Sequence, residues 1–375
     1  MRGKAHGWWF SLAWGSLAAP LGMGAAAAAQ APDRLERVDL KALEEAFVSL
    51  AEEVRPAVVA VRTYRVHDQE NSPFPNVRIP LSQGSGFVID PDGFIVTNRH
   101  VIDGADAISV RLIDGTAHDA VRVEDDPRSD LAVVRIDAGH LPAVRWGELS
   151  KVKVNQWSFA CGNPFGRANQ DGRSSITFGV VSALGRQMTR RLVGGSDTEY
   201  YGNLIETSAA INPGNSGGPL FNIHGEVIGV ITAIETTSGT NEGHGFAIPI
   251  DRNTRRILAS LKAGQKVRYG FLGVEVQEVE PDPTGRVVTL RSNLGAVIRE
   301  IKVPNGPAAK AGLKPRDIVI EYDGVLVENH DHLVRLVGFT PVGTDVVVAY
   351  LRSGAKQRTT VTIGDRAELL GLPEE

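Results

Sequence analysis

The sequence is poor in several kinds of residue, and each shortage excludes a class of protein. Its 375 residues include one cysteine, Cys161, so the chain can form neither an internal disulfide nor a thiolate metal cage. The formal net charge is −4 with both signs spread along the chain, which leaves no basic stripe for a nucleic-acid backbone. Beyond the N-terminal segment no run of about 18 apolar residues occurs, so we expect no second membrane span.

What the sequence does contain is typical of a β-rich globular protein. Hydrophobic residues make up 42% and charged residues 22%, as in ordinary folded domains. Forty-one glycines and 20 prolines stand against 6% aromatics, which favours tight turns and short strands over long helical bundles. The length suits two to three domains of about 150 residues each.

Residues 1–31 have the pattern of a secretory signal peptide. Arg2 and Lys4 precede an uncharged apolar run, which ends at Ala29-Gln-Ala, a sequence that fits an A-x-A cleavage site. The alternative is an uncleaved membrane anchor, because residues 8–29 carry no formal charge. Either interpretation places the rest of the chain outside the cytoplasm, in the periplasm or secreted.

The mature chain divides into two β-rich blocks. Helical spacing of apolar residues predicts a helix over 38–54, and Asp-Gly pairs at 92–93 and 114–115 favour hairpins. A helix is also predicted over 251–262, with a domain boundary near 265. Short apolar runs predict strands at 57–64, 84–89, 94–97, 108–112, 132–136, 157–161, 179–183 and 227–231. Their rhythm is that of a sandwich or barrel.

The hexapeptide 214–219, Gly-Asn-Ser-Gly-Gly-Pro, points to a nucleophilic serine at Ser216. Such a serine needs a backbone that turns sharply, so that its hydroxyl is exposed and nearby amides converge on a developing oxyanion. The flanking glycines permit that backbone. The amides of Gly214 and Ser216 are the expected donors. The alternative interpretation is an ordinary Pro-Gly-Asn-Ser turn without chemistry.

A serine nucleophile requires a base, and His100 is the best candidate because it ends a strand-like run that could deliver it to a cleft. The base in turn requires a buried carboxylate, and Asp130 lies directly before the apolar run 131–134. Taken singly, a surface histidine and a capping aspartate are the simpler interpretations. The order His100, Asp130, Ser216 makes the catalytic hypothesis the stronger one.

Together these stretches resemble the HtrA family of extracytoplasmic serine proteases. The resemblance rests on residues 84–89 (Gly-Ser-Gly-Phe-Val-Ile), 97–101 (Thr-Asn-Arg-His-Val), 130–134 (Asp-Leu-Ala-Val-Val), 162–166 (Gly-Asn-Pro-Phe-Gly) and 209–220. It implies a mainly β protein, with a chymotrypsin-like double β-barrel over 38–262 and a C-terminal PDZ domain over 266–364. It also implies an ATP-independent endopeptidase of protein quality control that acts on unfolded or misfolded proteins, built as a homotrimer or a larger homo-oligomer.

The resemblance also assigns roles to single residues. It implies the triad His100, Asp130 and Ser216, and an oxyanion hole formed by the 214–216 amides of Gly214, Asn215 and Ser216. Ile211 and Ala233 fall where family members line a small apolar pocket, so cleavage after Val, Ala or similar residues is expected. Two positions depart from the family pattern, because Glu206 and Ser208 stand where Gln and Asp are usual.

The second block resembles a PDZ domain in two places. Phe271, Leu272, Gly273 and Val274 look like the loop whose amides receive the C-terminal carboxylate of a peptide. Residues 307–320 match the segment that packs beside the peptide groove, with Arg316 at a turn where glycine is usual. The alternative is a small β domain that binds no ligand.

No cofactor and no metal are expected. The pair His330 and His332 has no third ligand in the sequence, and Cys161 lies in an apolar run that predicts a buried thiol. The rival function from another class is a non-catalytic holdase or peptide-binding scaffold that keeps the protease fold. A missing triad residue would favour it, and none is missing.

Overall fold

The computed structural model describes residues 39–67, 77–168, 172–191, 198–232, 244–279 and 294–371. The predicted signal peptide, 1–31, lies outside these ranges. The chain divides into two compact units, Met1–Ala46 and Phe47–Glu375, of which the first is described only from residue 39. None of the helices in the described ranges has the length and apolar content required to cross a bilayer.

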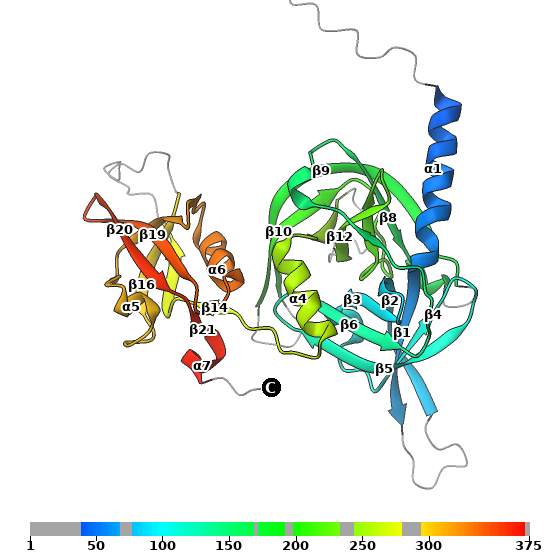
Figure 1. Cartoon of the computed structure of the whole chain (residues 1–375), viewed down its shortest axis with the longest axis horizontal. Coiled ribbons are helices and arrows are strands. Elements are labelled where there is room, and N and C mark those ends of the chain that lie inside the picture. Colours follow the sequence, from blue (N-terminus) through cyan, green and yellow to red (C-terminus); the bar gives the residue numbers. More distant parts are fainter. Residues whose placement is uncertain are drawn as a thin grey trace, which may run out of the picture. The chain divides into compact units, whose positions relative to one another are not determined.

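The first half of the larger unit is a closed barrel of six antiparallel strands in the order β1-β2-β3-β6-β5-β4 (Figure 1). The strands are β1 (Val58–His67), β2 (Val77–Asp90), β3 (Phe94–Asn98), β4 (Ala107–Arg111), β5 (Ala117–Asp126) and β6 (Leu131–Ile136). Both predicted Asp-Gly turns are confirmed, because Gly93 and Gly115 join β2 to β3 and β4 to β5 with φ of 88° and 86°. Only glycine adopts such angles without strain.

A second barrel follows in the chain. Its sheet has the order β11-β8-β9-β10-β13-β12-β7, and the further pairing of β11 with β12 closes a ring of six strands. Strand β7 joins the outside of that ring, parallel to β12. The strands are β7 (Arg145–Trp146), β8 (Trp157–Gly162), β9 (Ser175–Arg191), β10 (Thr198–Thr207), β11 (Pro219–Asn222), β12 (Glu226–Thr232) and β13 (Gly245–Pro249).

Helices lie at the ends and junctions of the barrels. Helix α1 (Leu40–Val54) precedes the first barrel, and Pro56 opens the short turn η1 (Arg55–Ala57) that follows it. Helix α4 (Arg252–Lys262) follows the second barrel, where Asp251 caps its amides and Gly264 ends it at φ 71°. Three single turns complete this half: α2 (Arg99–Ile102), η2 (Leu149–Lys151) and η3 (Pro164–Gly166).

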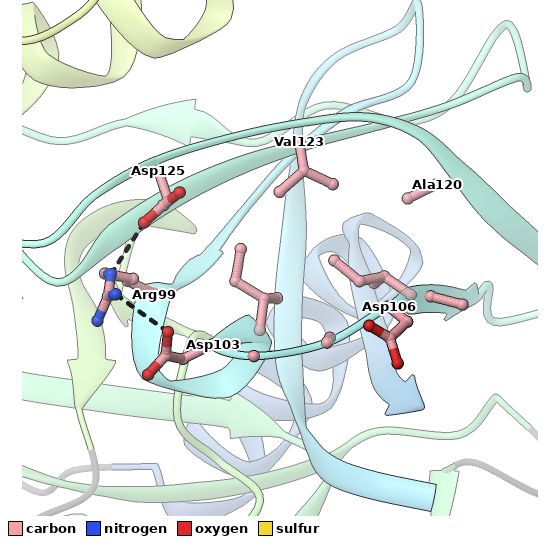
Figure 2. Close-up of a pocket in the computed structure, with 11 residues that line it drawn as sticks. Arg99, Asp103, Asp106, Ala120, Val123 and Asp125 are labelled. Atoms are coloured by element: carbon pink, nitrogen blue, oxygen red, sulfur yellow. Dashed lines mark hydrogen bonds and ion pairs between the residues drawn. The ribbon is translucent and has the colours of Figure 1, made fainter. Parts of the chain in front are cut away.

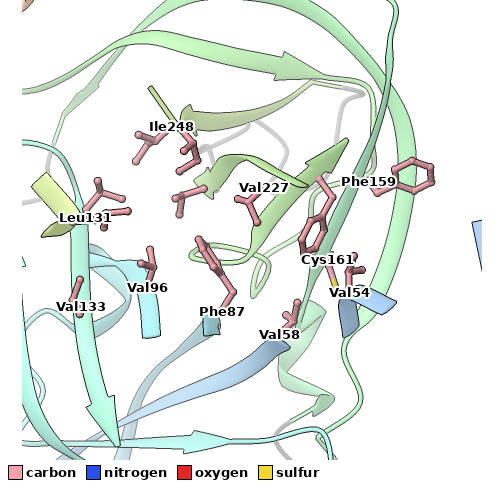
Figure 3. Close-up of a cluster of buried hydrophobic side chains, with 14 of the residues drawn as sticks. Val54, Val58, Phe87, Val96, Leu131, Val133, Phe159, Cys161, Val227 and Ile248 are labelled. Carbon is pink, nitrogen blue, oxygen red and sulfur yellow. The ribbon is translucent and has the colours of Figure 1, made fainter. Parts of the chain in front are cut away.

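One hydrophobic cluster joins the two barrels and α4. Phe87, Val96 and Leu131 reach it from the first barrel, and Phe159 and Val227 from the second, as Figure 3 shows. All five side chains are buried. Burial of each large apolar side chain contributes about 1.5–3 kcal/mol, so this shared core fixes the two barrels against each other. The segments beside these strands that contain His100, Asp130 and Ser216 are therefore anchored on one shared core.

The block after residue 268 has its own core. Its strands form a sheet in the order β15-β16-β17-β19-β20 with β18 beside β17, and a separate pair of β14 and β21. Its helices are α5 (Pro307–Lys310), α6 (His330–Phe339) and α7 (Arg366–Leu370). The strands are β14 (Gly270–Phe271), β15 (Val274–Glu278), β16 (Ala296–Ile301), β17 (Ile318–Tyr322), β18 (Val325–Leu326), β19 (Asp345–Arg352), β20 (Ala355–Thr362) and β21 (Gly364–Asp365). Leu272, Ile298 and Leu333 are among the buried members of its core.

Every predicted strand lies within or overlaps an observed one, and the mainly β fold class is confirmed. Among the strands of the two barrels, β5, β7, β10, β11 and β13 were not predicted. Strand β5 shows the reason, because its sequence Ala-His-Asp-Ala-Val-Arg-Val-Glu-Asp-Asp has exposed or half-buried residues at nearly every position. Without a continuous apolar face, the pattern gives no strand signal.

Candidate active site

The structure brings His100 and Asp130 together. Nδ1 of His100 lies 2.7 Å from Oδ2 of Asp130, and the backbone amide of His100 donates to Oδ1 at 2.9 Å. Both carboxylate oxygens therefore hold the same histidine, while the aspartate is only 2% exposed. A carboxylate that accepts from Nδ1–H leaves Nε2 as the basic nitrogen, which is the tautomer that a general base requires.

His100 is not the end of a strand, as the sequence pattern suggested. Strand β3 stops at Asn98, and His100 lies in the single helical turn α2. The turn forms because Asp130 lies directly before β6, the strand that pairs with β3: its carbonyl accepts from the amide of Arg99 and from the Asn98 side chain, both at 3.0 Å. Asp130 itself has φ 54°, a left-handed conformation that a non-glycine residue holds only when its surroundings enforce it.

The turn before Asp130 is anchored from a distance in the sequence. Asp126 accepts from the amide of Ser129 at 2.9 Å and from the hydroxyl of the buried Tyr269. The Arg128 guanidinium stacks 4.5 Å above the Tyr269 ring. Burial, followed by the neighbouring Asp126 carboxylate, raises the pKa of Tyr269, so its hydroxyl stays protonated and remains a donor. These contacts fix the segment that carries Asp130, and no local sequence motif predicts them.

The serine loop is shaped by its backbone. Gly214 has φ 101° and Gly217 has φ 83°, values that favour glycine. The amide of Gly217 donates to the carbonyl of Ile231, and the amide of Ile231 donates to the carbonyl of Gly218, both at 2.8 Å. These two bonds attach the serine loop to β12. Ser216 as a whole residue is only 5% exposed, so most of it is buried. The cause is close packing, because the Ser216 carbonyl accepts from Ser85 across the barrel interface at 2.8 Å.

Of the three predicted oxyanion residues, Asn215 is differently placed. Its amide donates to the carbonyl of Asn212 at 3.0 Å, within the loop, and so is directed away from an oxyanion. The amide of Gly218 donates to the Asn215 carbonyl at 2.9 Å, which completes a tight turn around the serine. The oxyanion hypothesis is therefore kept for the amides of Gly214 and Ser216.

Ile211, the predicted pocket residue, is 8% exposed and packs with Ile205, Ala209 and Ala247. Ile211 packs directly against Gly245, because a Cβ added at residue 245 would lie 2.4 Å from Cδ1 of Ile211. The close approach means that strand β13 leaves room for this isoleucine only because residue 245 is a glycine. Ala233 lies outside the described residues.

Glu206, one of the two departures from the family pattern, has partners that explain how it is tolerated. The residue is buried, yet its carboxylate accepts from Nε of Arg186 at 2.5 Å and pairs with Nδ1 of His244 at 2.7 Å. Burial acts to raise its pKa, but the hydrogen bonds from His244 and Arg186 outweigh burial and hold the pKa below its ordinary value. Glu206 is thus an anion at neutral pH.

The predicted carboxylate loop of the second block is a tight turn. Gly273 has φ 79°, and its carbonyl accepts from the amides of Lys302 and Val303 at 2.9 and 3.1 Å. Leu272 is buried, so only its backbone can face a ligand. Phe271 ends β14 and Val274 begins β15, so the loop stands between two strands. Arg316 is exposed at φ 75°, which confirms a surface turn.

Two other features were tested as sites. A cavity of about 310 Å³ on the first barrel is lined by Arg99 and the carboxylates of Asp103, Asp106 and Asp125. Figure 2 shows Arg99 bound to Asp103 and Asp125, at 3.0 and 2.9 Å, and Asp106 accepts from the amide of Val66, so each of these carboxylates has a partner within the protein. Within the described ranges no three His, Cys, Asp or Glu side chains are grouped as metal ligands.

Cys161 is also set aside. It is fully buried, as the sequence predicted, and burial raises the pKa of its thiol to about 12. A thiol with that pKa stays protonated at neutral pH and is a poor nucleophile.

The two barrels and the block that follows them define a serine protease of the chymotrypsin-like fold with a PDZ domain. The family models agree: a trypsin-like peptidase domain matches residues 84–230 and a PDZ domain matches residues 270–363. A DegP-like probable periplasmic serine endoprotease of Halomonas elongata is 39% identical over 350 residues, which cover 85% of this chain and 70% of that protein. The chain belongs to the HtrA family of serine proteases.

Two further comparisons agree with that assignment. A DegP-like protein of Pseudomonas savastanoi pv. phaseolicola is 42% identical over 294 residues, 78% of this chain. The chain spans only 57% of that relative's length. Among solved structures, the HtrA-type protease AlgW with a decapeptide superposes with a TM-score of 0.68 at 32% identity, over 85% of this chain and 98% of that one.

Proposed function

We propose that the chain is an ATP-independent serine endopeptidase of the periplasm that cleaves unfolded or misfolded proteins. The observation that carries the proposal is the pairing of His100 with the buried Asp130, at 2.7 Å, in a protease fold whose second barrel presents the Gly-Asn-Ser-Gly-Gly loop. The names of the relatives in Halomonas and Pseudomonas support the location and the activity.

In this mechanism Ser216 attacks the carbonyl carbon of the peptide bond. Its hydroxyl proton passes to Nε2 of His100, and the carboxylate of Asp130 stabilises the imidazolium that forms. The amides of Gly214 and Ser216 donate to the oxygen that becomes negative. His100 then gives the proton to the leaving amine. In the second half of the reaction, water takes the place of the serine hydroxyl, and hydrolysis of the acyl-enzyme restores Ser216.

Specificity for small aliphatic residues before the cut follows from the pocket in this proposal. Ile211 supplies one apolar wall, and Ala233 is proposed as the other. A lysine or arginine in such a pocket would bury a charge without a partner, which is strongly disfavoured. Val and Ala fill it without that penalty.

A variant and a digest test the catalytic proposal together. Ser216→Ala should abolish cleavage of an unfolded protein while the thermal unfolding temperature stays near that of the parent, because only a hydroxyl is lost. Mass spectrometry of the parent's digest should show cuts mainly after Val and Ala. Residual proteolysis in the variant would instead place the chemistry elsewhere. If the parent itself cleaved nothing but suppressed aggregation, the holdase hypothesis would replace this one.

The second block is proposed to bind the C-termini of peptides through the 271–274 loop. Gly273 provides the tight turn, and a peptide strand would extend the sheet edge beside it. The AlgW structure, determined with a decapeptide, supports a peptide ligand for this type of protease. Assembly into a homotrimer or a larger oligomer is proposed from the family alone.

Calorimetry on the full-length Ser216→Ala variant tests the PDZ proposal without digestion of the ligand. A peptide with an apolar C-terminal residue should bind clearly better as the free acid than as the amide, because the loop amides recognise the carboxylate. Equal affinities would show that the domain does not recognise a free C-terminus.

A further inference from the structure

Ser85 of strand β2 lies where three segments of the chain meet, and the catalytic mechanism above gives it no role. Its hydroxyl donates to the carbonyl of Gly214 at 2.7 Å, and its amide donates to the carbonyl of Ser216 at 2.8 Å. The same hydroxyl accepts from the amide of Asn163 at 2.8 Å. A side chain of the first barrel therefore holds the nucleophile loop of the second.

The packing leaves little room for any other side chain at this point. A Cβ at Gly162 would lie 2.8 Å from the Ser85 hydroxyl, and one at Gly217 would lie 2.3 Å from the Ser85 carbonyl. Ser85 itself is fully buried, and its carbonyl accepts from the hydroxyl of Thr97 at 2.7 Å. Four hydrogen bonds to neighbouring segments, together with this close packing, therefore fix the position of Ser85.

These bonds act on the peptide planes beside the oxyanion donors. The plane between residues 214 and 215 is held at both ends, its carbonyl by Ser85 and its amide by the carbonyl of Asn212. The plane after Ser216 is held in the same way, by Ser85 and by Ile231. The amide of Ser216 lies between these two fixed planes, and that of Gly214 directly precedes them. A loop with glycines at both sides would otherwise rotate easily.

We propose that Ser85 is a positioning residue for the oxyanion hole: its hydroxyl and amide fix the orientation of the Gly214 and Ser216 amides toward the reacting carbonyl. The inference rests on the proposed function. It explains why the motifs at 84–89, 162–166 and 209–220 meet in space. The role is positional, because the hydroxyl and amide of Ser85 bond to backbone atoms of Gly214, Asn163 and Ser216 and so act through the loop.

The test compares Ser85→Ala with a matched control, Ser158→Ala. Ser158 is also fully buried, and its hydroxyl bonds to that of Thr207 at 2.8 Å, away from the nucleophile loop. Ser85→Ala should lower kcat roughly 10- to 100-fold, less than the 10²–10³ lost when a donor itself is removed. KM and the acid limb of the pH profile should not move, because substrate contacts and His100 are unchanged. The control should keep kcat within about twofold of the parent.

Two further measurements separate positioning from a loss of folding. The affinity of a peptidyl boronate with a valine-like side chain should fall by the same factor as kcat, since its tetrahedral adduct uses the oxyanion hole. Ser85→Cys keeps a weak hydrogen-bond donor at this position and should recover part of kcat. This variant can be measured in place of Ser85→Ala if the alanine variant does not fold.

Equal kcat values for Ser85→Ala and Ser158→Ala would overturn the inference, as would a loss that follows the unfolded fraction or unchanged boronate affinity. Activity retained in Ser216→Ala would instead refute the proposed function itself. The two failures are thus distinguishable.

Discussion

The two barrels hold their parts of the site by different means. In the first barrel the base is fixed by side chains: both oxygens of Asp130 hold His100, and Asn98 holds the carbonyl of Asp130. In the second barrel the loop that carries Ser216 is shaped mainly by its backbone, through Gly214, Gly217 and hydrogen bonds between amides and carbonyls, and the Ser85 hydroxyl of the first barrel also holds it. The proposed base must keep one tautomer, which a carboxylate can select, whereas the proposed oxyanion donors are backbone amides, whose direction the loop conformation sets.

The largest expected effect tests whether the side chain of Asp130 fixes the tautomer of His100. In Asp130→Asn the amide oxygen can still accept from the His100 backbone, but its NH₂ group would face Nδ1 and demand the other tautomer. We expect kcat to fall about 10⁴-fold with little change in the unfolding temperature. Steady-state kinetics on a peptide substrate measures the loss.

Asp125→Asn is the matched control for this prediction. Asp125 lies near the end of β5, five residues before Asp130, and its partly exposed carboxylate bonds to Arg99, so its substitution should leave kcat within about twofold. A similar loss of kcat in both variants would contradict a specific role for Asp130.

The next effect tests the backbone half. Gly217→Ala would place a Cβ 2.3 Å from both the Ser85 carbonyl and the Thr97 hydroxyl, at φ 83°. We expect the free energy of unfolding to fall by about 3 kcal/mol or more from strain and overpacking combined. Urea unfolding followed by fluorescence measures it.

Gly104→Ala in the first barrel separates these two causes. Gly104 also has a left-handed φ, 66°, but the nearest atom to its Cβ would be the end of Arg65, at 3.5 Å. Only the conformational cost of about 1–2 kcal/mol should appear there. Equal losses of unfolding free energy in Gly217→Ala and Gly104→Ala would show that crowding around residue 217 is not the reason for its glycine.

Glu206 is the exception within the second barrel, since side chains hold it, and it gives the smallest predicted effect. Its folded-state pKa is lowered, so its stabilisation is present above the ordinary pKa of about 4.3 and is lost as pH falls through the folded value. Glu206→Gln should therefore lower the unfolding free energy by about 1 kcal/mol at pH 7, since its partners Arg186 and His244 are largely exposed.

The pH dependence checks that assignment. Unfolding free energies of the parent and Glu206→Gln, measured from pH 7 down to about pH 2, should converge only below the ordinary pKa of about 4.3, as Glu206 becomes protonated in the folded state. A difference that stays constant over this range would show that the ion pairs do not stabilise the fold.

The sequence predicted the pairing of His100 with Asp130 but not the structure around it. His100, Asp130 and Ser216 lie in motifs whose chemistry limits the residue types, and the two β-blocks follow from apolar runs and turns. The single-turn helix at His100 was missed because it depends on Asp130, which is distant in the sequence.

Sequence patterns did not predict contacts between residues that are distant along the chain. The anchoring of Asp126 by Tyr269 and the partners of Glu206 join positions tens of residues apart, and neither has a local signature. The Gly-Ser-Gly sequence at 84–86 supports the family resemblance, but only the structure shows that the Ser85 hydroxyl donates to the carbonyl of Gly214 in the other barrel.

The central claim is that Ser216 is a nucleophile activated by His100, and a fluorophosphonate probe tests it most directly. We predict a single covalent adduct that peptide mapping places on Ser216. Asp130→Asn should slow the labelling strongly, because Nδ1 of His100 would lose the carboxylate that holds it at 2.7 Å. An adduct on another residue, no adduct at all, or an unchanged labelling rate in Asp130→Asn would contradict this mechanism.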